Sequence, residues 1–307
     1  MTLEWTPWRE VRAAELPAAL RWLWRACADA SRCADVMRSL AANVIAVFPA
    51  CGGGSAEESE ELVDGLAERI PSRAFTVLLR AGRASIEVRG AMRRAARSRA
   101  ILMERVRICG DRAEIPRFLG LIRPLLVADL TTHCLWSGDC SEDDEDVLSF
   151  AGLADHLIVD SARFRDPARG LARRREAAAS AARVTDLNWL RLRPWRLALA
   201  EAFERFDGGG ATAAEIRHGP RARAQAIILG EWIRERTLAD VRLDCTEEGD
   251  GIQGLELRRG GSVVHIAPSK TGLEVRVTTR ELCHLPFVLP VRPRSPLDLL
   301  AAAIDSV

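Results

Sequence analysis

The sequence predicts an α/β protein: an N-terminal Rossmann-like domain with a mostly parallel sheet, followed by a smaller α+β domain with an antiparallel sheet. Apolar runs of strand length alternate with helical patterns over residues 41–160, which is typical of a doubly wound sheet. Short alternating runs follow at meander spacing after residue 240. The length of 307 residues suits two domains. We expect a Trp-rich helical arm at 1–40, the α/β domain at 41–162, a helical connection at 163–210 and the α+β domain at 211–307.

The N-terminal arm is predicted to be helical. Leu16, Leu20, Leu23, Trp24 and Cys27 recur at three- and four-residue steps and form one apolar stripe. Half of the eight tryptophans of the chain lie in this arm. Tryptophans gathered in this way either fold back on the body of the protein or anchor a partner.

The first domain is built from short apolar runs. The run at 43–48 does not alternate, which indicates a strand covered on both faces. Further strands are predicted at 74–79, 85–89, 103–108, 132–136 and 157–159, with helices at 57–70, 116–126 and before 151. The strands at 74–79 and 85–89 are too close for a crossover helix, so we expect them to form an antiparallel pair.

The second domain has a different pattern. A helix is predicted to start near Pro194, because proline is favoured in the first helical turn. A second helix is expected at 221–236 and a last one at 297–304. The strands expected between them lie at 241–245, 252–257, 263–266 and 273–277.

Composition excludes several classes of function. The formal charge is +1, from 44 basic and 43 acidic residues, which argues against a dedicated binder of nucleic acid or of an anionic membrane. No stretch approaches the roughly 20 apolar residues of a membrane span, and the N-terminus lacks a secretory pattern. The eight cysteines include no C-x-x-C pair. We expect a soluble cytoplasmic protein.

A glycine-rich turn, Gly52, Gly53, Gly54 and Ser55, follows the first strand and precedes a helix. Backbone amides at such a turn can approach a phosphate, and a helix N-terminus favours an anion. The turn lacks the lysine of G-x-x-x-x-G-K-[ST] and the spacing of G-x-G-x-x-G. It is therefore either a site for a nucleotide or sugar phosphate or a plain connection.

Two sets of reactive residues are predicted to be structural. His133, Cys134, Cys140 and His156 lack the spacing of a zinc site, and the first two point to opposite faces of a strand. A second set contains the residue types of a hydrolase triad but lies on one strand and its ends, without a G-x-S-x-G turn; it comprises Asp155, His156, Asp160 and Ser161. We expect no catalytic residue, metal or cofactor.

A Trp/Arg motif is the most distinctive local feature of the chain. It comprises Trp189, Arg191, Pro194, Trp195 and Arg196. Tryptophan and arginine dominate the binding energy of protein interfaces, so these residues are candidates for binding a partner. Alternatively, both tryptophans dock a helix between the domains while the arginines pair with carboxylates.

The motif resembles the D-L-x-W-x-R-L-T-P-W-R signature of the OpcA family, the glucose-6-phosphate dehydrogenase assembly proteins. Other family segments are matched in the same order at 71–73, 124–136, 154–161 and 228–233. The resemblance implies a non-catalytic protein that binds glucose-6-phosphate dehydrogenase and promotes its active oligomer in the oxidative pentose phosphate pathway. The alternative hypothesis is a phosphate-ligand sensor or enzyme that uses the turn at 51–55.

Overall fold

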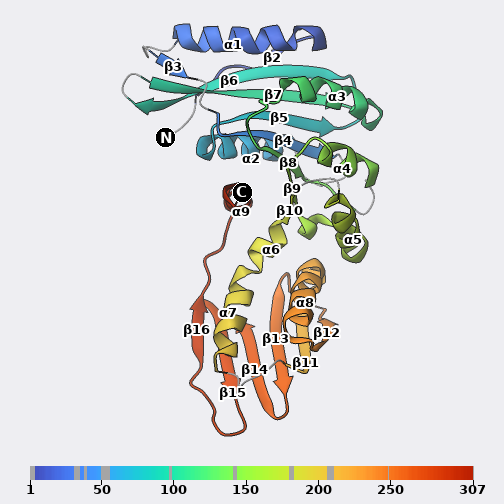
Figure 1. Ribbon diagram of the computed structural model, residues 1–307, viewed down its shortest axis with the longest axis vertical. Helices are drawn as coiled ribbons and strands as arrows, with labels where there is room; N and C mark the ends of the chain where they lie inside the picture. Colours follow the sequence, from blue (N-terminus) through green and yellow to red (C-terminus); the bar gives the residue numbers. More distant parts are fainter. Residues whose placement is uncertain are drawn as a thin grey trace. The chain divides into compact units, whose positions relative to one another are not determined.

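In the computed structural model, the protein forms two compact units. The first unit contains Met1–Arg165, Ala172–Thr185 and Pro296–Val307, and the second contains Asp166–Leu171 and Asp186–Ser295. The structure describes residues 4–30, 35–37, 40–49, 56–96, 99–140, 144–179, 183–205, 211–247 and 249–306. Figure 1 shows a large sheet in the first unit and a smaller sheet in the second.

The sheet of the first unit has the strand order β1-β6-β7-β5-β4-β8-β9-β10, with β2 paired to β6 and β3 paired to β7. Its strands are β1 (Glu4–Trp5), β2 (Arg9–Glu10), β3 (Asp35–Met37), β4 (Ala42–Pro49), β5 (Ser72–Leu79), β6 (Ser85–Ala96), β7 (Arg99–Gly110), β8 (Thr132–Trp136), β9 (His156–Val159) and β10 (Arg183–Asp186). The neighbours from β7 through β5, β4 and β8 to β9 all run parallel. The prediction of a mostly parallel sheet is therefore confirmed.

The centre of this sheet is buried on both faces. Every residue of β5 and β8 is buried, and in β4 only Phe48 is partly exposed. A strand covered on both sides reads as a continuous apolar run, which explains why the sequence indicates strands at residues 43–48 and 74–79.

The predicted pairing of 74–79 with 85–89 is wrong. β6 pairs with β7 in a long antiparallel ladder, and β7 lies between β6 and β5. The reason is that both β6 and β7 are longer than predicted and follow each other closely in the chain, so they form a local hairpin.

The helices of the first unit differ from the prediction at both ends of the chain. They are α1 (Leu16–Ala30), α2 (Ala56–Arg69), α3 (Ile115–Ile122) and α4 (Asp144–Ala151), with α5 (Pro167–Ala177) divided between the units. Within the predicted helical arm, β1 and β2 instead pair with β6, because their backbone groups complete its edge. The last helix, α9 (Pro296–Asp305), packs against α2 and so groups with the first unit rather than with the second sheet.

The second unit is a six-stranded sheet with two helices, α7 and α8, on it (Figure 1). Its strand order is β12-β11-β13-β14-β15-β16, and its elements are α6 (Leu187–Arg191), α7 (Arg193–Phe203), β11 (Ala213–His218), α8 (Arg223–Thr237), β12 (Asp240–Cys245), β13 (Ile252–Arg259), β14 (Ser262–Pro268), β15 (Gly272–Thr278) and β16 (Phe287–Pro290). From β11 through β13 to β16 the pairs are antiparallel, whereas β11 and β12 run parallel and are joined through α8. The predicted smaller α+β domain with an antiparallel sheet is thus confirmed.

Among the described helices, none combines the length and the apolar character needed to cross a lipid bilayer.

Candidate partner interface

The Trp/Arg motif forms the corner between α6 and α7. Asp186 begins α6: its carboxylate accepts a hydrogen bond from the backbone N–H of Asn188 at 2.9 Å, as a helix cap does. Pro194 lies in the first turn of α7, as predicted, where its missing N–H costs nothing. The sequence therefore ends one short helix and begins the next within a few residues.

Trp189 and Arg196 are bound to each other across this corner. The guanidinium carbon of Arg196 lies 3.5 Å from the centroid of the Trp189 ring, and its Nη2 donates to the Trp189 carbonyl at 3.1 Å. Burial lowers the pKa of Arg196, and the nearby charge of Arg193 lowers it further. The pair therefore stabilises the turn between the two helices.

Arg191 is tied to α8 through Asn188. Asn188 is fully buried, and its Oδ1 accepts from Arg191 Nη1 at 2.9 Å and from Gln225 Nε2 at 3.1 Å. Because Gln225 lies on α8, one amide oxygen joins two helices of the second unit. Asn188 was not singled out from the sequence, since a single asparagine carries no distinctive pattern.

Trp195 is buried and lies on the same side of α7 as Leu199 and Ala202, as predicted. The helix packs against β14 and β15. The opposite side of α7 is exposed and carries Arg193 and Leu197. The motif therefore places its tryptophans and Arg196 in packing positions, next to a helical surface open to solvent.

The glycine-rich turn at Gly52, Gly53, Gly54 and Ser55 lies outside the described residues. The helix that follows it, α2, carries Glu57 and Glu58 in its first turn. Carboxylates there satisfy the helix dipole and repel a phosphate. The phosphate site at this turn stays a prediction.

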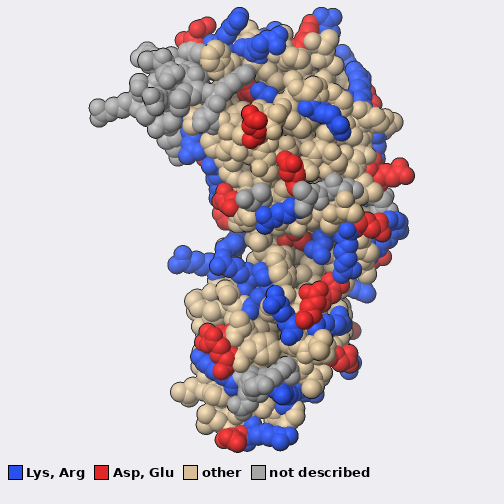
Figure 2. Space-filling view, in the orientation of Figure 1, with Lys and Arg blue, Asp and Glu red and all other residues tan. Residues whose placement is uncertain are grey.

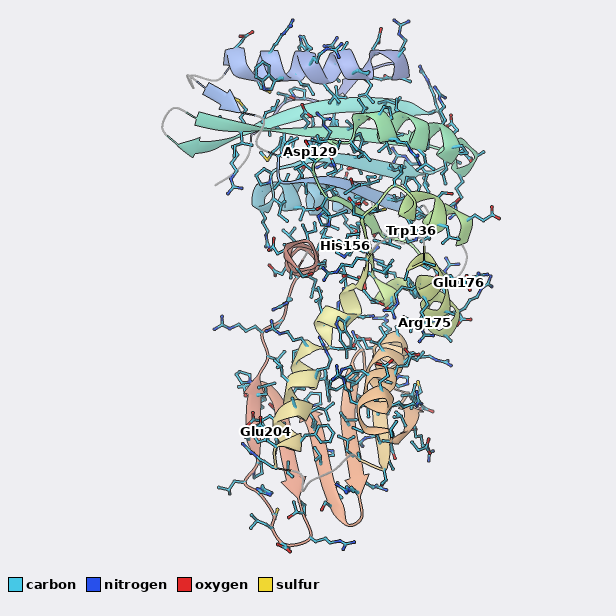
Figure 3. The ribbon with its side chains drawn as sticks, in the orientation of Figure 1. Asp129, Trp136, His156, Arg175, Glu176 and Glu204 are labelled. Carbon is cyan, nitrogen blue, oxygen red and sulfur yellow. The ribbon has the colours of Figure 1, made fainter. Side chains whose placement is uncertain are left out.

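His133 and His156 face each other in the core of the first unit (Figure 3 labels His156). Their Nδ1 atoms lie 3.0 Å apart, and His156 Nε2 lies 2.8 Å from Thr185 Oγ1. Burial lowers the pKa of both rings, that of His156 to about 4. One ring donates its proton to the other, so the pair is a neutral, hydrogen-bonded core element.

The neighbouring residue types do not assemble into a reactive group. Burial raises the pKa of Cys134 to about 12, which keeps the thiol protonated and unreactive. Asp155 accepts from the backbone N–H of Thr132, and Asp160 caps the turn at Ala162. In the part of the chain that the structure describes, no three His, Cys, Asp or Glu side chains are placed to hold a metal ion.

A charge cluster around the buried Arg105, which sequence analysis missed, lies between α2 and the edge of the first sheet. Arg105 is fully buried and bonds to Asp64 and to Thr76 Oγ1, the latter at 2.9 Å. Arg89 donates to the same Asp64 carboxylate at 2.6 Å. Arg107 bonds to Glu60 and, at 2.8 Å, to Glu87. The alternation of arginines along β7 was the signal available in the sequence, but it does not reveal the carboxylates opposite.

Two tryptophans of the N-terminal segment cover this charge cluster. Trp8 lies 4.2 Å from the Arg89 guanidinium and 4.3 Å from that of Arg107. Trp5 lies 4.7 Å from Arg89. These two tryptophans therefore fold back on the body of the unit, which is one of the two alternatives considered for the arm.

The protein therefore has one Rossmann-like unit and one α+β unit, and the second unit contains the Trp/Arg corner between α6 and α7. Two family profiles match the chain, and both are described as domains of a glucose-6-phosphate dehydrogenase subunit. The profile of the N-terminal domain matches residues 63–176, and the profile of the C-terminal domain matches residues 182–307. The chain belongs to the OpcA family, as the resemblance of its motifs predicted.

Two curated relatives carry the name "Putative OxPP cycle protein OpcA". The protein from Nostoc punctiforme is 26% identical over 187 residues, which cover 58% of this chain and 40% of the relative. The protein from Synechocystis is 27% identical over 140 residues, which cover 44% of this chain and 30% of the relative. The matched regions thus span less than half the length of either curated relative.

A solved structure with a related arrangement of elements is KijD10, a 3-ketoreductase from Actinomadura kijaniata determined in complex with NADP and TDP-benzene. It is 10% identical to this chain, the superposition has a TM-score of 0.49, and the match covers 87% of this chain and 88% of the other.

Proposed function

We propose that this protein is a non-catalytic assembly factor that binds glucose-6-phosphate dehydrogenase and favours its active oligomer. The observation that carries the proposal is the pair of family matches at residues 63–176 and 182–307. Both families are described as domains of a glucose-6-phosphate dehydrogenase subunit. The names of the two curated relatives place those proteins in the OxPP cycle, which agrees with the proposal.

The chemistry of the described residues supports a binding role. The buried histidines bond to each other, the Cys134 thiol is held protonated, and the buried Arg73 and Arg105 are paired with carboxylates. These groups are occupied in holding the fold. A protein that acts by docking needs a stable surface rather than a reactive constellation.

In this proposal the protein promotes assembly because it binds two forms of the dehydrogenase with different affinities. A partner shifts the equilibrium of the dehydrogenase toward the active oligomer only if it binds that oligomer more tightly than the inactive form. In this proposal Trp189, Arg191, Pro194, Trp195 and Arg196 hold the α6–α7 corner in shape. The exposed side of α7, with Arg193 and Leu197, is then presented to the enzyme as a preformed surface, which reduces the entropy lost on binding.

Sedimentation velocity tests the proposal with purified protein and the dehydrogenase of the same organism. We expect a faster-sedimenting complex that contains both chains. The variant R191A/R196A should weaken the complex by at least about tenfold, because two side chains that fix the corner are removed. The matched control R221A/R236A removes two exposed arginines of the second unit and should bind as the unaltered chain does. Independent sedimentation of the two unaltered proteins would contradict the proposal.

A further inference from the structure

Two tryptophans of α1 are exposed to solvent, on opposite flanks of its buried stripe, so Trp24 lies beside that stripe and not within it as predicted. Trp22 is 47% exposed and Trp24 is 36% exposed, and Arg21 and Arg25 beside them are exposed as well. These four residues are called the α1 face below. Tryptophan and arginine are the residues that most often dominate binding at protein interfaces.

The packing of α1 does not require this face. The helix rests on β6 and β7, and its buried side chains form the opposite stripe: Leu16, Ala19, Leu20, Leu23 and Cys27. A helix that docks on a sheet through one stripe normally turns polar residues outward. Two large exposed indole rings, one at each edge of the outward side with Arg21 and Arg25 between them, are therefore not required by the packing of the helix.

One of these rings is already held in position. The guanidinium of Arg9, on β2, lies 4.5 Å from the centroid of the Trp22 ring. Because β2 is paired to the first sheet, this contact fixes an exposed tryptophan against a rigid element. A side chain ordered in advance loses little freedom when a partner binds.

The α1 face continues into a cavity at the N-terminal end of the helix. The cavity has a volume of about 570 Å³ and is formed by the segment 10–14, the segment 83–86 and α3. Ala14 lines it, and Ala18 and Trp22 follow Ala14 at four-residue steps along the outer side. The cavity therefore adjoins the α1 face at the edge that carries Trp22.

This surface carries a modest excess of positive charge. Its arginines are Arg9, Arg21 and Arg25 along the helix and Arg12, Arg83 and Arg117 around the cavity. Its acidic residues are Glu10, Glu15, Asp29 and Glu114, of which Glu15 is bonded to Arg12 and Glu114 to Arg117. Figure 2 shows blue side chains over α1, with red side chains toward both of its ends. A cationic surface with apolar rings is complementary to an acidic segment that carries apolar side chains.

We propose that the α1 face and the adjoining cavity bind an acidic, partly apolar segment of glucose-6-phosphate dehydrogenase. This inference rests on the proposed function and adds a second contact region, in the first unit. A protein segment fits better than a membrane, since the apolar stripe of α1 is turned into the unit and is closed to lipid. A protein segment also fits better than nucleic acid, because proteins that bind nucleic acid carry a much larger positive charge than the net charge of +1 found here.

The test measures the dissociation constant of the complex with the cognate dehydrogenase for two α1 variants. W22A/W24A should raise the dissociation constant by at least about tenfold. R21Q/R25Q should raise it less and should reduce its dependence on salt concentration, because fewer charges are buried in the contact. The control L282A/L285A removes two exposed leucines of the second unit and should leave it unchanged. Thermal unfolding of each variant reports whether the first unit stays folded.

The outcomes separate the two proposals. If the unaltered chain binds and both folded α1 variants bind equally well, the assignment of the α1 face is overturned while the proposed function stands. The assignment is also overturned if L282A/L285A weakens binding as much as W22A/W24A. If W22A/W24A unfolds, the salt dependence of R21Q/R25Q decides, because those two side chains project from the exposed side of the helix. If the unaltered chain does not bind the dehydrogenase, both proposals fail.

Discussion

Arg196 stacks on the indole ring of Trp189 and at the same time donates a hydrogen bond to the carbonyl of that residue, seven positions earlier in the chain. The two contacts join α7 to α6 across the turn between them. Two residues of the motif that resembles a family signature thus stabilise the turn between α6 and α7.

Replacement of Arg196 should destabilise the second unit. R196A removes a cation–π contact and a hydrogen bond, and we expect the free energy of unfolding to fall by about 1–3 kcal/mol. R196K keeps the charge but not the planar stacking, so it should recover only part of the loss. Urea unfolding followed by tryptophan fluorescence measures both variants. Equal stability of R196A and the unaltered protein would show that the corner does not depend on this contact.

Replacement of Asn188 should cost more than replacement of its partner on α8. N188A removes the acceptor shared by Arg191 and Gln225 in a fully buried position, which should lower the free energy of unfolding by about 2–3 kcal/mol. Q225A removes only one of the two bonds, from a partly exposed side chain. Chemical unfolding of the two variants compares them directly, and an equal loss would argue against Asn188 as the shared acceptor.

Two carboxylates of the first unit, Asp64 and Asp298, provide a comparison of ion pairs that differ in burial. D64N breaks the bonds to Arg89 and to the fully buried Arg105, and should destabilise the protein by about 3 kcal/mol because a buried cation loses its counter-charge. D298N breaks the bond between Asp298 and Arg69, whose side chains are each 42% exposed, and should cost less than about 1 kcal/mol. Differential scanning calorimetry of the pair measures the contrast. Similar melting temperatures for the two variants would refute it.

The buried histidines should make the protein sensitive to mild acid. The pKa of His156 is lowered from 6.5 to about 4, so the unfolded chain takes up a proton over a pH range in which the folded chain does not. The free energy of unfolding should therefore fall as the pH drops from about 7 to 4. H156Q removes this group, and its stability should decline less over that range, by about 1–3 kcal/mol. Parallel pH dependence in urea unfolding of the two proteins would contradict this reading.

The central strands of the first sheet were predictable because a strand buried on both faces consists of consecutive apolar residues, which can be recognised locally in the sequence. β4 and β5 read as unbroken apolar runs, and parallel pairing followed from the helix between them. The helix at Pro194 was predictable for a similar reason, since proline in a first turn is a local signal.

The contacts that stabilise the first unit were not predictable, because they join distant parts of the chain. Nothing near Asp64 indicates that Arg89 and Arg105 lie opposite its carboxylate. The apolar face of α9 is evident, but its partner α2 is more than 200 residues away in the chain. The tryptophans of the arm divide between two roles, with Trp8 folded back over arginines and Trp22 exposed.

The most direct test of the central claim is the activity of the cognate glucose-6-phosphate dehydrogenase, measured over a range of concentrations of this protein. We expect a saturable rise in glucose-6-phosphate oxidation, together with a growing share of the larger enzyme oligomer, and no oxidation by this protein alone. An unchanged rate at every concentration, or turnover of glucose 6-phosphate by the isolated protein, would contradict it.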